Sequence, residues 1–339
     1  MPAIASVSAS APVRMADLGG WTDTWFAGHG RVLNVALAPG VEVRLSRVPG
    51  GEGVRIRAEN FGDDYRYDPA GASRHPLIEA AIDAAAPPGA ALSVAVRSAM
   101  PPGAGTGTSA AVVVALLAAF DRLTGVTRSP GELAAAAHAL EVSRLRRQSG
   151  IQDQIAAAHG GVSFIEMPEY PRAIVTPVAL SAGLRAALER RLLLIFLGRA
   201  HHSSAVHLEV IASLEQGGGA PRALDRLRQA ADDGRAALGA GDLDAFARAL
   251  TANTEAQGAL HPALVSPEAR RVWDLARAQG ATGWKVNGAG GDGGSLTLMM
   301  GAGARRRRLL AALDAAVHGA RAIPFTLSHE GVQVEGREA

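Results

Sequence analysis

Alternating apolar and polar residues predict strands in the first third of the chain. Val41–Val48 and Val54–Glu59 both alternate, and the turn-rich segment Pro49–Gly53 separates them. Because successive side chains of a strand point to opposite faces, this pattern predicts a β-hairpin. Ala91–Arg97 alternates in the same way and predicts a further strand.

Helical patterns begin directly after that strand. The loop Met100–Gly107 is rich in proline and glycine, and the apolar run Ser109–Leu123 behind it has the length of a helix. Helical spacing recurs in Gly131–Arg147 and Ile151–His159, and the apolar segment Gly161–Glu166 predicts a strand. The central unit of this half is therefore a strand, a glycine loop and a helix.

The second half of the chain begins with a change of composition. Glu169–Leu184 has the composition of a loop, and the apolar run Arg191–Gly198 after it predicts a buried strand. We therefore expect two domains, residues 1–185 and 186–339. The elements expected in the second domain are four helices (Ser203–Glu215, Ala220–Leu238, Leu243–Gln257 and Pro267–Gln279), two strands around a glycine turn (Thr282–Asn287 and Ser295–Met299), and a final helix and strand.

Composition indicates a soluble globular protein. Of the 339 residues, 48% are hydrophobic and 19% are charged, which is too apolar for a disordered tail and too charged for a membrane bundle. The longest uncharged apolar run, Ala110–Phe120, is shorter than the roughly 20 residues of a membrane helix, so no membrane partner is expected. Met1–Pro12 lacks the basic and apolar segments of a secretory signal, and we expect a cytoplasmic protein.

Charge and cysteine content exclude further classes. The chain has 34 Lys and Arg against 32 Asp and Glu, and its basic run, Arg305–Arg308, contains no interleaved aromatic residues. We therefore expect a solvated helix end there and no nucleic-acid partner. The absence of cysteine excludes disulfides, thiolate metal sites and a cysteine nucleophile. The single lysine, Lys285, is either functional or a remnant of an arginine-rich composition.

The first chemistry-bearing segment is the glycine loop before the apolar helix. Gly103, Gly105 and Gly107 precede a helix start that Thr108 or Ser109 could cap. Free N–H groups at a helix start bind anions, and glycines let a phosphate approach the backbone closely. The loop is not a Walker loop, because no Gly-Lys-Ser/Thr closes it, and it lacks the acidic residue that a dinucleotide fingerprint requires. A plain capped turn is the alternative.

Three further segments carry glycine or charge. Lys285–Met299 has five glycines between two predicted strands, which suits a backbone lying against a ligand. Near the N-terminus, a Gly-Gly turn is surrounded by three charged residues, Arg14, Asp17 and Asp23. In GIQDQIAAAHGG, Asp153 is flanked by two amides and precedes an apolar run, which alone is equally typical of a helix cap.

Taken in this order, the four segments resemble the GHMP kinase superfamily of galactokinase, homoserine kinase, mevalonate kinase and phosphomevalonate kinase. GTGTSA at Gly105–Ala110 is similar to the family's G-L-G-S-S-A loop, and Gly288–Gly294 to its G-A-G-G-G-G turn. GIQDQIAAAHGGVSFIE and residues 260–291 look like the heptose-phosphate kinase branch, and GGWTDTWF resembles the fucokinase domain. The resemblance covers about residues 8–330. Three residues depart from the family pattern: Thr106, Thr108 and Asp292.

The resemblance implies an α+β protein of two domains. Its N-terminal half would be like domain 2 of ribosomal protein S5, its C-terminal half would be ferredoxin-like, and the active site would lie in the cleft between them. ATP and Mg²⁺ are the implied cofactors, and no covalent intermediate is needed, because phosphoryl transfer chiefly requires positioning and charge neutralisation. The residues that match the nucleotide-binding pattern are Gly103, Gly105, Gly107, Thr108, Ser109, Gly288, Gly290 and Gly291.

Matched residue by residue, the resemblance also implies catalytic roles. Asp153 matches a base toward the acceptor hydroxyl, and Arg14 matches its cationic partner, which would keep the aspartate ionised. Glu141, with the hydroxyl of Thr108 or Ser109, matches the Mg²⁺ ligands. The alternative for Glu141 is a solvated helix carboxylate.

The Gly-Gly-x-Thr-Asp motif implies the acceptor site. Asp23 matches a ligand of a sugar hydroxyl, with Gly20 and Thr22 in the same motif, and a turn aspartate bonded to its own backbone is the alternative. The expected partner is therefore a small molecule, and a homodimer is left open. His29, His201 and His202 lack the spacing of a metal site.

The activity implied by the resemblance is transfer of the ATP γ-phosphoryl group to the anomeric hydroxyl of a sugar or sugar phosphate. The leading acceptor is a heptose 7-phosphate, which would give the 1,7-bisphosphate. A fucose-type sugar 1-kinase and a catalytically silent ligand-binding relative are the alternatives. A phosphorylated acceptor needs a cationic pocket, for which the candidates are Arg144, Arg146, Arg147, His201 and His202.

Overall fold

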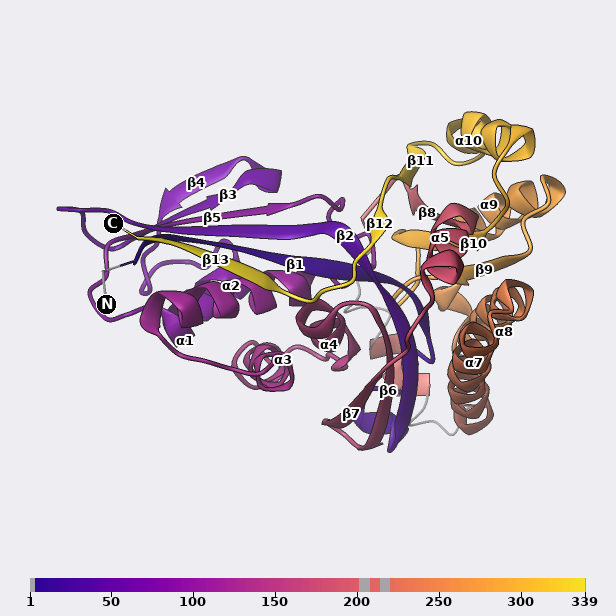
Figure 1. The fold of residues 1–339 in the computed structure, drawn as a ribbon, viewed down its shortest axis with the longest axis horizontal. Helices are drawn as coiled ribbons and strands as arrows, with labels where there is room; N and C mark the ends of the chain where they lie inside the picture. Colours follow the sequence, from indigo (N-terminus) through magenta and orange to yellow (C-terminus); the bar gives the residue numbers. More distant parts are fainter. Residues whose placement is uncertain (1–3, 201–207, 214–219, 339) are drawn as a thin grey trace.

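Two β-sheets organise the chain (Figure 1). The computed structural model describes residues 4–200, 208–213 and 220–338. Within these residues, the larger sheet runs in the order β13-β1-β2-β5-β3-β4, with β6 and β12 also paired to β2, and β7 paired to β6. Its strands are β1 (Ile4–Leu18), β2 (Gly30–Arg47), β3 (Val54–Ala58), β4 (Asp63–Arg66), β5 (Leu92–Ser98), β6 (Val162–Glu169), β7 (Arg172–Pro177), β12 (Thr326–Leu327) and β13 (Gln333–Glu338). The smaller sheet has the order β11-β8-β10-β9 and consists of β8 (Leu192–Leu197), β9 (Gly283–Val286), β10 (Ser295–Met299) and β11 (Ala320–Ile323).

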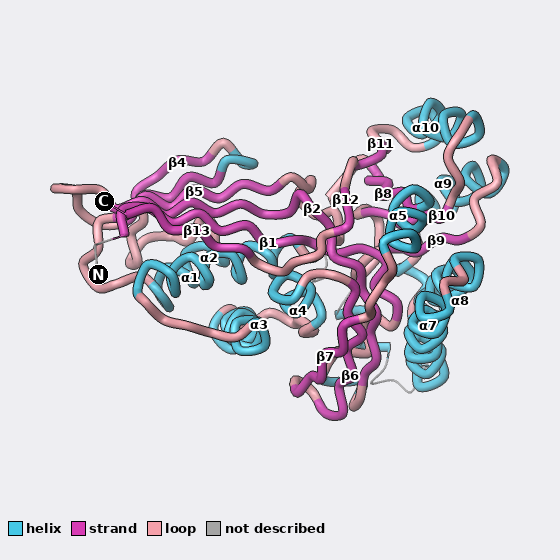
Figure 2. The backbone as a smooth tube through the Cα atoms, in the orientation of Figure 1, coloured by secondary structure: helices cyan, strands magenta, loops and turns pink. Residues whose placement is uncertain are grey.

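Helices cover one face of the larger sheet and surround the smaller one (Figure 2). Those of the first half are α1 (Pro76–Ala85), α2 (Thr108–Thr124), α3 (Pro130–Ala139) and α4 (Gln152–His159). Those of the second half are α5 (Ala182–Arg191), α7 (Ala220–Ala240), α8 (Leu243–Leu260), α9 (Pro267–Ala278) and α10 (Ala304–Ala316). No helix in the described ranges combines the length and the apolar character needed to cross a membrane.

The central unit of strand, glycine loop and helix is confirmed. β5 leads through the loop into α2, whose Ala, Val and Leu side chains are almost all buried against β1 and β2. An apolar helix on a half-covered sheet removes a large apolar area from water, which is the main favourable contribution to folding. This packing fixes the end of α2 to which the glycine loop is joined.

The predicted hairpin between β2 and β3 is wrong. β5 lies between the two strands, antiparallel to β2 over residues 41–47 and parallel to β3 over residues 54–58. An alternating strand can pair on either edge, so its side-chain pattern does not identify its neighbour.

Two other expectations are also corrected. The segment predicted as a loop, Glu169–Leu184, contains β7, which forms a hairpin with β6, and the start of α5. The helix predicted to reach Arg147 changes at Leu140 into a π-helical turn, Leu140–Arg144, and residues 145–150 are irregular. A helical period cannot reveal a turn that is one residue wider than the rest.

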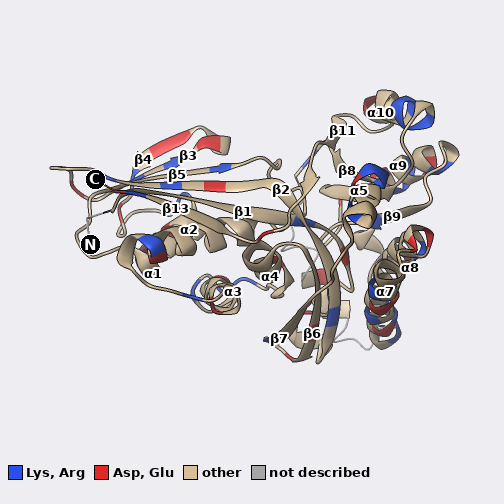
Figure 3. Cartoon of the chain, in the orientation of Figure 1, with Lys and Arg blue, Asp and Glu red and all other residues tan. Residues whose placement is uncertain are grey.

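The second half follows the expected order of elements. The helices and strands predicted between residues 220 and 316 are confirmed, whereas the single strand expected after the last helix is instead three strands, β11, β12 and β13. Of the helix expected over Ser203–Glu215, only residues 208–213 lie in the described part, where they are helical. The basic run Arg305–Arg308 lies in the first turns of α10, at the outer edge of the molecule (Figure 3). The two-part α+β fold is thus confirmed.

The end of the chain returns to the first sheet. β13 pairs antiparallel with β1, and β12 pairs with β2. The boundary expected between residues 185 and 186 falls inside α5 and stays a prediction. The larger sheet is therefore completed only when the last strand of the chain is in place.

Candidate active site

The four segments singled out in the sequence meet around one pocket of about 250 Å³. It lies where the glycine loop, the start of α4 and the Gly-Gly turn after β1 approach the glycine turn between β9 and β10. Its lining includes Arg14, Asp23, Gly103, Gly105, Gly107, Thr108, Ser109, Glu141, Asp153 and Gly288. Residues from both halves of the chain therefore form the pocket.

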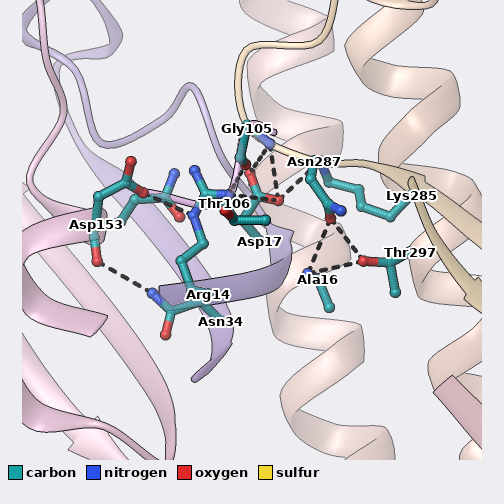
Figure 4. Close-up of polar contacts among 12 residues, drawn as sticks. Arg14, Ala16, Asp17, Asn34, Gly105, Thr106, Asp153, Lys285, Asn287 and Thr297 are labelled. Carbon is teal, nitrogen blue, oxygen red and sulfur yellow. Dashed lines mark hydrogen bonds and ion pairs between the residues drawn. The ribbon is translucent and has the colours of Figure 1, made fainter. Parts of the chain in front are cut away.

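Arg14 and Asp153 form an ion pair in this pocket (Figure 4). Arg14 Nε donates to Asp153 Oδ1 at 2.8 Å, and another guanidinium nitrogen of Arg14 donates to the carbonyl oxygen of Gly105. Burial lowers the pKa of Arg14, but the carboxylates of Asp153 and Asp17 outweigh that effect and raise the pKa overall. Asp153 thus lines the pocket beside the buried guanidinium group of Arg14.

Asp153 does not cap α4. The N-cap residue of α4 is Ile151, and no side-chain cap is present. The interpretation of Asp153 as a helix cap is therefore wrong. Its carboxyl group instead lies against the glycine loop, because a Cβ added to Gly107 would come within 3.1 Å of Asp153 Cγ.

The glycine loop leaves the start of α2 without a side-chain cap. The N-cap residue is Gly107, in the left-handed conformation with φ of +72°. The expectation that Thr108 or Ser109 could cap this helix is therefore wrong. The Thr108 hydroxyl lies 3.2 Å from the Thr106 hydroxyl, and Ser109 is exposed. Uncapped N–H groups at the positive end of a helix are the arrangement that binds phosphate.

Glu141 lies in the π-helical turn and lines the same pocket. It is buried, Gln154 Nε2 donates to its Oε1 at 2.8 Å, and burial raises its pKa to about 7. The described residues contain no cluster of three or more His, Asp or Glu side chains suited to a metal. The oxygens of Glu141, Thr108 and Ser109 nevertheless form a hard donor set of the kind that Mg²⁺ prefers. The alternative of a solvated carboxylate is wrong.

Asp23 is buried at the other side of the pocket. Its carboxylate accepts hydrogen bonds from the backbone N–H of Gln152 at 3.0 Å and from Gln152 Nε2 at 3.4 Å. Burial raises the pKa of Asp23 to about 6. Thr22 and Gly20 do not line this pocket; Thr22 Oγ1 donates to Gly19 O at 2.7 Å, so these two residues shape the turn that presents Asp23.

Only part of the C-terminal glycine turn reaches the pocket. Gly288 lines it, whereas Gly290 and Gly291 pack against the carbonyl of Leu264, to which the N–H of Gly291 donates at 3.2 Å. The side chain of Asp292 is exposed, and its backbone carbonyl accepts from Arg199. The carboxylate of Asp292 therefore does not interrupt the pocket.

A buried polar network behind the pocket was missed by the sequence reasoning (Figure 4). Asp17 accepts from the N–H of Gly288 at 3.0 and 3.2 Å and lies 3.5 Å from Lys285 Nζ. Lys285 Nζ donates to Gln257 Oε1 at 3.0 Å, and Gln257 Nε2 donates to Gly288 O at 3.1 Å. Both the N–H and the carbonyl group of Gly288 are thus hydrogen-bonded to buried side chains. The single lysine of the chain is buried in this network, a location that its position in the sequence did not reveal.

A second, apolar pocket of about 270 Å³ adjoins the first. The two share Gly103, Thr108, Ser109 and Arg147. The apolar lining of the second pocket includes Phe61, Pro76, Leu77, Ile78, Val96, Met100, Pro102 and Val112. A flat apolar group joined to phosphates would fit such a pair of pockets, with its phosphates at the shared loop. The sequence reasoning missed this wall because its residues come from five separate segments of the chain.

The candidate cationic residues are dispersed. Arg144 donates to the carbonyl of Ala80 at 3.2 Å, and of the three arginines only Arg147 lines the pocket. His201 and His202 lie outside the described residues. Of the three candidates within the described residues, the structure therefore brings one to the site.

Comparison with known proteins identifies a curated relative. A curated relative, the D-glycero-alpha-D-manno-heptose 7-phosphate kinase of Campylobacter jejuni, is 27% identical over 192 residues. The match covers 56% of this chain and 56% of the relative, so it spans about half of the relative's length.

Solved structures show the same fold. A D-glycero-D-manno-heptose 1-phosphate kinase from Bacteriodes thetaiotaomicron superimposes with a TM-score of 0.75 at 23% identity, covering 98% of this chain and 100% of that one. A putative sugar kinase from Campylobacter jejuni gives a TM-score of 0.78 at 21% identity, covering 99% and 100%.

Two domain models of one family match the chain in order. The model of the GHMP kinase N-terminal domain matches residues 76–161, which contain the glycine loop, Glu141 and Asp153. The model of the GHMP kinase C-terminal domain matches residues 235–315, which contain the second glycine turn. The chain therefore belongs to the GHMP kinases, whose N-terminal and C-terminal domains it carries.

Proposed function

We propose that the protein uses ATP and Mg²⁺ to phosphorylate the anomeric hydroxyl of a sugar or sugar phosphate. The leading acceptor is a heptose 7-phosphate, which would give the 1,7-bisphosphate. The observation that carries this proposal is the Arg14–Asp153 pair at 2.8 Å, set directly against the glycine loop at Gly107. A general base beside a phosphate-binding helix start would position the two reactants and take up the proton of the acceptor hydroxyl.

Each group of pocket residues would have a separate role in the reaction. The glycine loop and the start of α2 would bind the nucleotide phosphates, and the apolar pocket next to them would take the base. Asp153 would accept the proton of the acceptor hydroxyl, and Arg14 holds its carboxylate in position. Glu141 with Thr108 and Ser109 would hold Mg²⁺. When bound, the ion neutralises phosphate charge.

Asp23 would orient the acceptor. Its carboxylate is buried among the N–H groups of Gln152 and lines the same pocket as Asp153. A carboxylate that accepts a sugar hydroxyl would fix one face of the ring while Asp153 addresses the reacting hydroxyl.

A fucose-type sugar 1-kinase is the second candidate. A phosphorylated acceptor needs cations near its phosphate, and of the described arginines proposed for that role only Arg147 lines the pocket. This favours an acceptor without a phosphate. The heptose-phosphate assignment rests on the named relatives, which is why both acceptor classes are to be compared directly.

The test is ADP release against a panel of acceptors. The panel contains heptose 7-phosphate, the unphosphorylated heptose, fucose and galactose, each with ATP and Mg²⁺. Phosphorus NMR of the product then identifies the phosphorylated position. We expect turnover with one acceptor class and phosphate on the anomeric oxygen. Nucleotide binding without ADP release for every acceptor would instead indicate the silent ligand-binding relative.

A further inference from the structure

We propose that Arg147 is a further catalytic residue, whose guanidinium group contacts the nucleotide phosphates during transfer. The inference rests on the proposed kinase function and assigns a role within that site. It differs from the expectation that Arg147 recognises a phosphate of the acceptor.

The position of Arg147 indicates which phosphates it meets. It follows the π-helical turn that carries Glu141, and its backbone N–H donates to Glu141 O at 3.0 Å. Its side chain lines both the polar pocket and the apolar pocket. The other residues common to both pockets are Gly103, Thr108 and Ser109, all from the glycine loop and the start of α2. A side chain at this junction adjoins the loop that would bind phosphate, where the polar and the apolar pocket meet.

The other nearby cations are already engaged. Arg14 binds Asp153 and Gly105 O, Lys285 is buried behind the pocket, and Arg144 donates to the carbonyl of Ala80. Among the described residues, the guanidinium group of Arg147 has no hydrogen bond and no ion pair within 4 Å, and its side chain is exposed. It is therefore the pocket cation whose donors remain available to a ligand.

The chemistry of the transfer calls for such a cation. The acceptor oxygen forms a bond to Pγ while the bond from Pγ to the β,γ-bridging oxygen breaks, and the electron pair of that bond leaves with ADP. The acceptor proton passes to Asp153. Negative charge spreads over the γ-phosphoryl oxygens and the leaving oxygen, and a planar guanidinium group can donate to two of these oxygens at once.

The experiment compares Arg147→Gln and Arg147→Lys with Arg146→Gln in the full chain. Arg146 is the matched control, because it is the adjacent exposed arginine and lines neither pocket. We expect Arg147→Gln to lower kcat by about 100-fold with little change in the KM of the acceptor. Arg147→Lys should recover part of the loss, and Arg146→Gln should behave as wild type.

Binding measurements separate this inference from the proposed function. By calorimetry, Arg147→Gln should bind ATP more weakly than wild type does and bind adenosine equally well. If wild type binds neither compound, the proposed function and this inference both fail. If wild type turns over and Arg147→Gln matches it, only the inference is overturned. A rise in KM confined to phosphorylated acceptors, at unchanged kcat, would overturn it in favour of acceptor recognition.

Discussion

At the scale of single residues, two carboxylates of the pocket differ in their surroundings. Asp153 is 29% exposed and paired with Arg14, whereas Asp23 is 3% exposed and accepts hydrogen bonds from neutral N–H groups, two of them from Gln152. The first environment leaves a carboxylate that is positioned by a cation and accessible to a substrate. The second raises the pKa of Asp23 to about 6, chiefly through burial.

Asp153→Asn tests the base directly. The amide keeps the size of the side chain and removes the ionised oxygen, so we expect turnover to fall by about 100 to 10,000-fold while folding and nucleotide affinity are retained. The matched control is Asp121→Asn on α2, another largely buried aspartate paired with an arginine, at 2.7 Å from Arg128. That control should alter the melting temperature and leave turnover intact. Full turnover in Asp153→Asn would leave positioning and charge neutralisation as the whole mechanism.

Asp23 predicts a pH dependence of acceptor binding. Its pKa in the folded protein, about 6, lies above the ordinary value of 3.8, so its ionised form costs stability as the pH rises from about 4 through 6. Below about pH 6 the protonated group accepts sugar hydroxyls less well, and the KM of the acceptor should rise. Asp23→Asn should have a high KM that no longer changes across this range. An equally steep dependence in the variant would assign the titration to another group.

At the scale of elements, α2 has a left-handed glycine at each end. Gly107 is its N-cap residue with φ of +72°, and Gly125 is its C-cap residue with φ of +77°. A Cβ at Gly107 would meet the carboxyl group of Asp153, whereas a Cβ at Gly125 would meet nothing within 4 Å. The backbone requirement is therefore the same at both ends, and only one end adjoins the pocket.

The pair Gly107→Ala and Gly125→Ala separates backbone strain from function. Each should lose on the order of 1 kcal/mol of stability, because an L side chain disfavours this conformation. Only Gly107→Ala should also lose turnover, since its methyl group displaces Asp153 and narrows the approach to the helix start. Melting curves and turnover on the same preparations provide the comparison. Similar turnover in both variants would mean that the loop tolerates a side chain facing Asp153.

At the scale of the whole molecule, polar side chains join the two halves behind the pocket. Asp17 holds the N–H of Gly288 and lies 3.5 Å from Lys285 Nζ, and Asn287 Oδ1 accepts from the N–H of Ala16 at 3.2 Å. These contacts connect β1 of the larger sheet to β9 and the glycine turn of the second half. They hold the start of the glycine turn against β1.

Removing one partner of this network should destabilise the protein strongly. Lys285→Met removes one of the two cations within 4 Å of the buried Asp17 carboxylate, the other being Arg14 at 3.9 Å, and we expect a loss of about 3 kcal/mol. The double variant Asp17→Asn with Lys285→Met should lose less than the sum of the single variants, because neither charge remains alone. Arg55→Met, which breaks the exposed pair with Asp64, is the control and should change the unfolding midpoint little. Additive losses in the double variant would show that the two residues act independently.

The sequence by itself determined the features that depend on neighbours along the chain. The apolar run of α2, the glycine loop before it and the order of the four chemistry-bearing segments are local, and the structure brings those segments to one pocket. A helix or strand can be predicted from its own residues and from the turn before it. This is possible because backbone preferences and the spacing of apolar side chains act over only a few residues.

The tertiary structure decided what depends on distant partners. The insertion of β5 between β2 and β3, and the exclusion of Gly290 and Gly291 from the pocket, follow from pairing and packing across the chain. The burial of Lys285 against Asp17 joins residues more than 260 positions apart. Such contacts have no local sequence pattern. The hydrogen-bonding groups of a strand edge and a buried charged side chain each need a partner, and the fold determines which residue that is.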